Sequence, residues 1–136
     1  MLSKKTQYAF KSLTYLAEND QKGPVLIADI ASKKKIPIKF LESILLELKK
    51  AGILGAKKGK GGGYYFVQKP DQVKLATIMR LMEGPIALLP CVSLHFYHKC
   101  TDCNEKKCGL NKTMAAVRDQ MLTILEHKSV LDLVVQ

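Results

Sequence analysis

Four cysteines within a short stretch of the chain are the residues best suited to carry chemistry. They follow the pattern Cys91-x8-Cys100-x2-Cys103-x4-Cys108. A Cys-x-x-Cys pair with two further cysteines in one irregular segment is typical of thiolate ligation of zinc or iron. The spacing therefore predicts that Cys91, Cys100, Cys103 and Cys108 bind a metal ion or an iron–sulfur cluster.

Other interpretations of these cysteines remain open. Their spacing differs from that of a zinc ribbon, which has two distant Cys-x-x-Cys pairs, and from the bacterial ferredoxin pattern. The thiols could instead act as a redox pair that forms a disulfide, or lie buried without a role. His95 and His98 lie in the same segment and are candidate substitute ligands.

No pattern typical of catalysis accompanies the cysteines. The chain contains neither Gly-x-Ser-x-Gly nor His-Glu-x-x-His. Its glycines at 55–63 do not match a phosphate-binding P-loop, which requires G-x-x-x-x-G-K followed by Ser or Thr between a strand and a helix. An enzyme using Cys91 and His95 has no further feature to support it, so we predict that the protein is not an enzyme.

Positive charge is concentrated in the first half of the chain. The net charge is +10, and residues 1–74 carry 15 Lys and Arg against 6 Asp and Glu, whereas residues 75–136 carry 7 against 6. A polyanion is the natural partner of such a surface, because neutralising phosphates releases condensed counterions. The alternative is that the lysines only keep the surface solvated and soluble and bind no partner.

The hydropathy of the chain predicts a cytoplasmic protein. No stretch approaches the roughly 20 apolar residues of a membrane span, so we expect no membrane contact. The first residues have no apolar run typical of a secretory signal. The cysteines would then be kept reduced, which favours ligands or redox thiols over a structural disulfide framework.

Apolar periodicity and turn residues predict the elements that must position these groups. We expect a helix over 6–19 capped by Thr6, a short helix around 27–31, and a helix from Pro37 to about Ala51. A β-hairpin over 53–67, a helix from Leu75 to Gly84 and a last helix with an apolar seam at 110–124 follow. The fold class is mainly α, with a small hairpin.

Two helices followed by a basic, glycine-rich hairpin predict a winged helix-turn-helix, whose second helix enters the major groove. We expect that helix to bury Ile38, Leu41, Ile44, Leu45 and Leu48, which leaves Lys39, Glu42 and Ser43 outside to read base edges. Residues 33–60 hold nine lysines against two acidic residues. The predicted DNA-binding residues are Lys35, Lys39, Glu42, Ser43, Lys57, Lys58, Lys60, Gly61, Gly62 and Tyr64.

The last predicted helix carries a heptad-like apolar seam. Its members are spaced 4, 3, 4 and 3 residues apart: Leu110, Met114, Val117, Met121 and Ile124. Such a seam requires a partner surface. Packing on the chain's own domain and pairing with the same helix of a second subunit both remain open.

The chain resembles the Rrf family of bacterial winged-helix transcriptional regulators over nearly its whole length. The most specific match is Leu48-Lys49-Lys50-Ala51-Gly52-Ile53-Leu54 followed by Lys58-Gly59-Lys60-Gly61-Gly62-Gly63-Tyr64. Further matches are Tyr8-Ala9-Phe10 in the first helix, Ile27-Ala28-Asp29-Ile30-Ala31 in the second and Ile36-Pro37-Ile38-Lys39-Phe40-Leu41-Glu42 in the third.

The resemblance implies a homodimer that binds double-stranded operator DNA and dimerises through its C-terminal helix, about Asn111 to His127. Lys39 and Glu42 fall on positions that read bases in relatives, and Lys58 falls on a wing position that is usually Arg. Several relatives hold a [2Fe–2S] or [4Fe–4S] cluster, and Cys91 falls where their first ligand lies. The remaining spacing departs from the family pattern, which has five residues between successive cysteines.

These observations together predict a sequence-specific repressor with three parts. We expect a DNA-binding domain over 1–85, a cysteine-rich sensor loop over 86–109 and a dimerisation segment over 110–136. A bound iron–sulfur cluster is expected to modulate DNA binding. The alternatives are a regulator with structural zinc or a thiol–disulfide switch, and a metal-binding module whose basic face meets an acidic protein.

Overall fold

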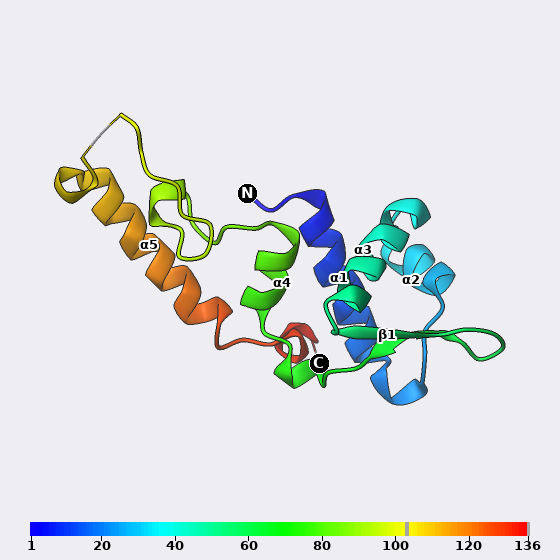
Figure 1. Ribbon diagram of the computed structural model, residues 1–136. Helices are drawn as coiled ribbons and strands as arrows, with labels where there is room; N and C mark the ends of the chain where they lie inside the picture. The colour runs from blue at the N-terminus through cyan, green and yellow to red at the C-terminus, as the bar shows by residue number, and fades with distance from the viewer. Residues whose placement is uncertain (103, 136) are drawn as a thin grey trace.

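A computed structural model describes residues 1–102 and 104–135, and within them the chain forms five α-helices and one two-stranded antiparallel hairpin (Figure 1). This confirms the mainly helical fold class predicted from the sequence. The bounds are α1 Lys4–Glu18, α2 Ile27–Lys34, α3 Ile38–Lys50, β1 Leu54–Lys57, β2 Gly63–Phe66, α4 Leu75–Met82 and α5 Gly109–Leu125.

Helix α1 begins two residues earlier than its periodicity predicts, and the expected Thr6 cap is wrong. Ser3 is the N-cap, because its backbone is extended and its hydroxyl accepts a hydrogen bond from the Thr6 amide at 3.2 Å. The Thr6 hydroxyl instead donates to the Glu83 carboxylate at 2.7 Å. That carboxylate also accepts from the Ser3 amide, which lowers the pKa of Glu83 and joins the end of α4 to the start of α1.

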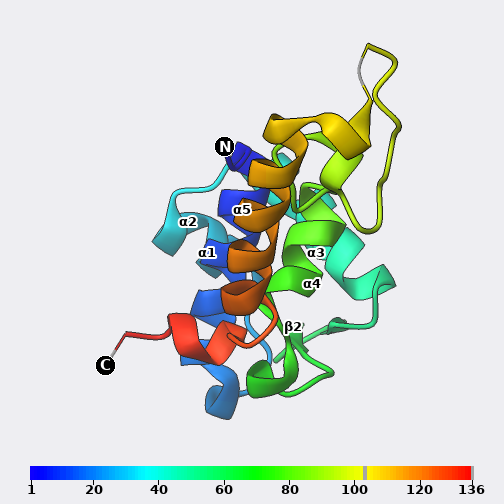
Figure 2. The same cartoon turned by 90° about the vertical axis from the view of Figure 1, so that its left-hand side faces the viewer.

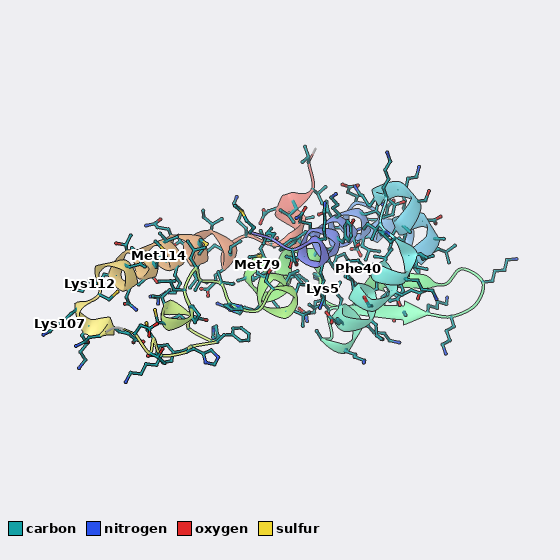
Figure 3. The ribbon with its side chains drawn as sticks, turned by 90° about the horizontal axis from the view of Figure 1, so that it is seen from above. Lys5, Phe40, Met79, Lys107, Lys112 and Met114 are labelled. Atoms are coloured by element: carbon teal, nitrogen blue, oxygen red, sulfur yellow. The ribbon has the colours of Figure 1, made fainter. Side chains whose placement is uncertain are left out.

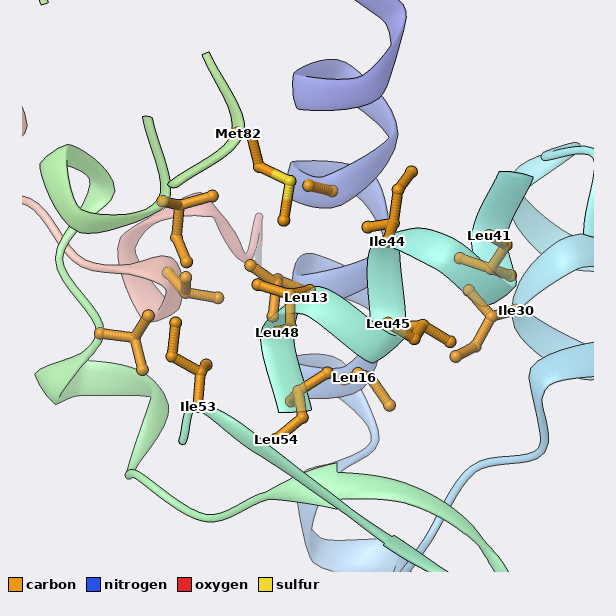
Figure 4. Packing of buried hydrophobic residues seen from close by; sticks show 14 of the residues in the cluster. Leu13, Leu16, Ile30, Leu41, Ile44, Leu45, Leu48, Ile53, Leu54 and Met82 are labelled. Atoms are coloured by element: carbon orange, nitrogen blue, oxygen red, sulfur yellow. The ribbon is translucent and has the colours of Figure 1, made fainter. Parts of the chain in front are cut away.

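The apolar stripe of α3 forms the centre of the main core (Figure 4). Leu41, Ile44, Leu45 and Leu48 are fully buried, as expected. The prediction that Ile38 is buried with them is wrong, because its exposed fraction is 44%. Ile38 is the first residue of the helix, one turn before the stripe enters the core.

The hairpin is attached to the helices at both ends. Gly52 ends α3 with a φ of +78°, a conformation that favours glycine. Strand β2 bonds to β1 and also to Val25, which exchanges two backbone hydrogen bonds with Tyr64 at 2.8 and 2.9 Å. A Cβ on Gly63 would lie 2.3 Å from the Val25 carbonyl oxygen, so only glycine permits this close approach.

Helix α4 belongs to the main core through Leu75, Ile78 and Met82, and on its other side it shares a second, smaller buried cluster with α5 (Figure 2). Ala76 of α4, Leu122 of α5 and Ile86 of the intervening segment make up this second cluster. Helix α5 begins at Gly109 and ends at Leu125, about two residues before the expected 111–127 at both ends. A terminal turn, η5 (Val130–Leu133), returns to the main core, where Val130 is fully buried and donates to the Val73 carbonyl at 2.9 Å.

Two adjacent leucines of α3 test this packing. Leu45 is fully buried, whereas the exposed fraction of Leu46 is 45%. We expect Leu45→Ala to lower the free energy of unfolding by about 2–5 kcal/mol, because it removes buried methyl groups and leaves a cavity. Leu46→Ala should change it by less than about 1 kcal/mol. Urea unfolding measures both, and equal losses would contradict the assignment of the buried face.

Candidate DNA-binding surface and cysteine loop

The first two turns of α3 expose the residues predicted to read bases. Lys39, Glu42 and Ser43 are all exposed, because the opposite face of the helix is buried in the core. The Ser43 hydroxyl donates to the Phe40 carbonyl at 2.8 Å, so only its oxygen remains available as an acceptor. Lys35 is exposed at the end of α2, in a left-handed conformation with a φ of 55°.

The hairpin turn presents three lysines to solvent. Lys57, Lys58 and Lys60 are exposed, and Gly61 beside them is exposed with a φ of +74°. Among the described residues, none of these three lysines forms a salt bridge. Their charges are therefore available to an anion.

Two other residues predicted to bind DNA have structural roles in the hairpin. Gly62 is buried, and a Cβ there would lie 2.2 Å from the Lys57 carbonyl oxygen, so this glycine closes the turn. Tyr64 is half-buried and packs against the main core. Their local surroundings explain their residue types without any contact to DNA.

The segment between α4 and α5 lies at the opposite end of the molecule from the hairpin (Figures 1 and 3). Cys91, Cys100 and Cys108 line one pocket of about 350 Å³ in this segment, whereas Cys103 lies outside the described residues. No disulfide joins the three described cysteines. Within 1–102 and 104–135, no three His, Cys, Asp or Glu side chains are gathered closely enough to hold one metal ion.

The two candidate histidine ligands are separated. His98 lines the cysteine pocket, whereas His95 lines a different, much smaller cavity beside Arg80 and Leu122. An arrangement of Cys91 and His95 as a catalytic pair is therefore not present in this part of the structure.

Asn111 connects two of the thiols. Cys108 is the N-cap of α5, and its sulfur accepts a hydrogen bond from the Asn111 amide at 3.4 Å. The side-chain Nδ2 of Asn111 donates to the Cys91 sulfur at 3.3 Å. The first turn of α5 thus holds Cys91 and Cys108 on the same side of the pocket.

Glu105 organises the other side of the loop. It lies in the short turn η4 (Glu105–Lys107), and its carboxylate accepts from the Tyr97 hydroxyl at 2.8 Å and from the Cys100 amide at 3.2 Å. The hydrogen bond to Glu105 raises the pKa of Tyr97. Glu105 therefore positions the backbone at Cys100.

A third contact ties the loop to α5. Arg118 Nη1 donates to the Val92 carbonyl at 2.7 Å, one residue after Cys91, in the turn η3 (Pro90–Val92). The sequence analysis missed Asn111, Glu105 and Arg118. None of the three had a local signal in the sequence, because each contacts a residue of the loop that only the fold brings near it.

One face of α5 is only partly covered by the described residues. Thr113, Ala116, Val117, Gln120, Met121 and Ile124 line a shallow, mostly apolar groove of about 390 Å³ along the helix. The exposed fractions of Leu110 and Ile124, the first and last members of the predicted seam, are both 57%. The chain's own domain therefore covers only part of that seam.

Comparisons with known proteins agree with this arrangement. The family model Rrf2, described as an iron-dependent transcriptional regulator, matches residues 2–136. The chain belongs to this family. An rrf2-like HTH-type transcriptional regulator of Rhodobacter capsulatus is 36% identical over 98% of this chain and 91% of its own length. Members of the family are transcriptional regulators and not enzymes, as the sequence analysis expected.

Individual Rrf2 relatives extend the likeness to IscR and CymR proteins. The HTH-type transcriptional regulator IscR of Aliivibrio salmonicida is 31% identical over 66% of this chain and 54% of its own length. The solved structure of CymR, the global cysteine regulator of B. subtilis, superposes with a TM-score of 0.80 and 26% identity, covering 98% of this chain and 95% of that one. T. potens IscR has a TM-score of 0.75 over 98% and 85% of the chains.

No helix within the described residues is both long and apolar enough to cross a membrane.

Proposed function

We propose that this Rrf2 protein is a cytoplasmic, homodimeric repressor that binds a specific DNA operator and responds to an iron–sulfur cluster in its cysteine loop. The observation that carries the proposal is the exposed start of α3 together with the lysine-rich hairpin, at the end of the molecule opposite the cysteines. We assign DNA binding to residues 1–85, sensing to 86–109 and dimerisation to 110–136. Repression requires only that the operator be occupied, whereas activation needs a further surface for the polymerase.

Base reading is assigned to the exposed residues of α3. Lys39 donates to guanine O6 and N7, Glu42 accepts from a cytosine amino group, and the Ser43 oxygen accepts from an exposed base donor. Lys35 and the hairpin lysines contact flanking phosphates, which supply affinity without sequence information. Lys58 acts as a point charge, because an ammonium lacks the bidentate geometry of a guanidinium.

DNA binding can be tested with duplexes selected by the wild-type protein from a random-sequence pool. We expect Lys39→Gln to reduce discrimination between the selected duplex and a scrambled one by about 1–3 kcal/mol. Lys58→Gln should weaken binding to both duplexes similarly and lower the slope of log K against log salt by about 1. Fluorescence anisotropy at several salt concentrations measures both, and equal wild-type affinity for the two duplexes would refute sequence-specific binding.

A second copy of this chain is the proposed partner of the α5 groove. The exposed apolar residues follow the heptad-like seam, and a two-fold axis would place the same face of a second α5 against them. Each recognition helix would then meet one half-site of the operator.

The oligomeric state tests this assignment. We expect Val117→Glu to convert the dimer to a monomer, because it places a carboxylate in the groove without a partner. Thr123→Glu adds the same charge at an exposed position of α5 outside the groove and should leave the dimer intact. Sedimentation equilibrium distinguishes the two; a wild-type protein that is already monomeric overturns the proposal.

The cysteine loop offers several thiols to one site, because Cys91, Cys100 and Cys108 line the same pocket. Iron–sulfur clusters are held by cysteine thiolates, so this lining suits a cluster. Cys91, Cys100, Cys103 and Cys108 would hold the cluster, which when bound supplies a redox- and oxidant-sensitive centre.

Coupling to DNA follows from the contacts of the loop with α5. Asn111 and Arg118 join the segment around Cys91 to α5, and Leu122 joins α5 to α4. A change in loop conformation would therefore shift α5, and with it the spacing of the two recognition helices in a dimer. Half-site spacing makes DNA affinity depend on that distance.

Anaerobic purification with iron and acid-labile sulfide analysis tests the cofactor. We expect both elements, with visible absorbance, in the wild-type protein and in His95→Ala, whose side chain lines a separate cavity. Cys91→Ser should lose most of them, because it removes one thiolate ligand. Zinc without sulfide would contradict the cluster and favour a structural site, and absence of any metal would favour a thiol switch.

A further inference from the structure

Two lysines of α1 gather over one aromatic ring. The Nζ atoms of Lys4 and Lys11 lie 6.0 and 5.9 Å from the centroid of the Tyr8 ring, so the two ammonium groups are at most about 12 Å apart. Residues 4, 8 and 11 share one face of the helix. The faces of an aromatic ring attract cations, so the ring favours positions of both ammonium groups close to Tyr8.

This cluster of Lys4, Tyr8 and Lys11 lies beside the recognition helix. The Tyr8 ring meets Phe40 of α3 edge-on, with centroids 5.4 Å apart and an interplanar angle of 87°. Phe40 follows Lys39 directly in the first turn of α3, and its exposed fraction is 37%. The labelled Lys5 and Phe40 in Figure 3 mark where the two helices meet. The cluster therefore borders the end of α3 that is proposed to enter the groove.

The charge of the cluster is not compensated by an ion pair. Lys5, its neighbour in the sequence, is bound to Glu47 of α3 at 2.9 Å, but neither Lys4 nor Lys11 forms a salt bridge among the described residues. Both are exposed. Lys4 also lies in the first turn of α1, where the helix dipole disfavours a cation. Lys4 is therefore unfavourable for the stability of α1, and a residue that breaks a local rule in this way is often there for function.

We propose that Lys4 and Lys11 form a second phosphate-binding site, on α1, which grips the DNA backbone alongside the groove that α3 enters. The inference rests on the proposed DNA binding and adds residues outside the helix-turn-helix and the hairpin. B-DNA carries one charge per 3.4 Å of axis on each strand, so two ammonium groups within about 12 Å can contact neighbouring phosphates of one strand. Tyr8 is a positioning residue that keeps both lysines beside α3.

The test uses the double variant Lys4→Gln/Lys11→Gln and the full-length protein. Its probe is a 30-base-pair duplex of mixed sequence, about three helical turns, because phosphate contacts do not depend on base sequence. We expect the slope of log K against log salt to fall by about 2, and affinity at 0.1 M salt to fall on the order of tenfold. Tyr8→Phe should retain wild-type binding, because the ring remains.

The control is Lys107→Gln/Lys112→Gln, which removes the same charge at the far end of the molecule (Figure 3). An equal loss in this control would show a general effect of net charge and overturn the inference. If Lys58→Gln lowers the salt slope but the α1 variant does not, the α1 site fails while the proposed function stands. If no protein shows salt-dependent binding, both fail. Unchanged thermal unfolding shows that each variant is folded.

Discussion

Burial of one face of α3 is the constraint on which the rest of the structure depends. Leu41, Ile44, Leu45 and Leu48 are fully buried between α1, α2 and the hairpin, and removing any of them from the core would cost about 1.5–3 kcal/mol in transfer free energy alone. With that stripe inside, the helix must turn Lys39, Glu42 and Ser43 to solvent. The same packing attaches the hairpin, because Ile53 and Leu54 are buried directly after Gly52.

The residues proposed to bind DNA and the cysteines lie at opposite ends of the molecule. Charged residues that suit DNA lie on α1, α3 and the hairpin, whereas the thiols lie at the other end, beyond α4. Two contacts connect these regions: Glu83 joins α4 to α1, and Leu122 joins α5 to α4. Packed helices move as units rather than deforming gradually, so the proposed response of the cysteine loop would pass through these contacts as a helix displacement.

Beyond the buried Ile86, Val92 and Ser93, the cysteine loop is held by polar contacts rather than by a core. Asn111, Glu105 and Arg118 bond to the loop at or next to the cysteines, and most of the segment 94–107 is exposed. Few buried apolar contacts imply low local stability, which is a property expected of a segment that responds to a bound group. Side-chain contacts of this kind have no period along the sequence, so the conformation of the loop could not be predicted from residue spacing.

Much of this protein was determined by its sequence alone. The α3 stripe, the glycine after it and the lysine-rich hairpin are local patterns, and each predicted its element because helix period and turn chemistry act over a few residues. Tertiary structure decided the rest. Thr6 bonds to Glu83, 77 residues away, rather than capping α1, and Asn111 reaches Cys91 across 20 residues. Such partners depend on how helices pack, so the exposure of the α5 seam, the separation of His95 from His98 and the side-chain contacts around the thiols became visible only in three dimensions.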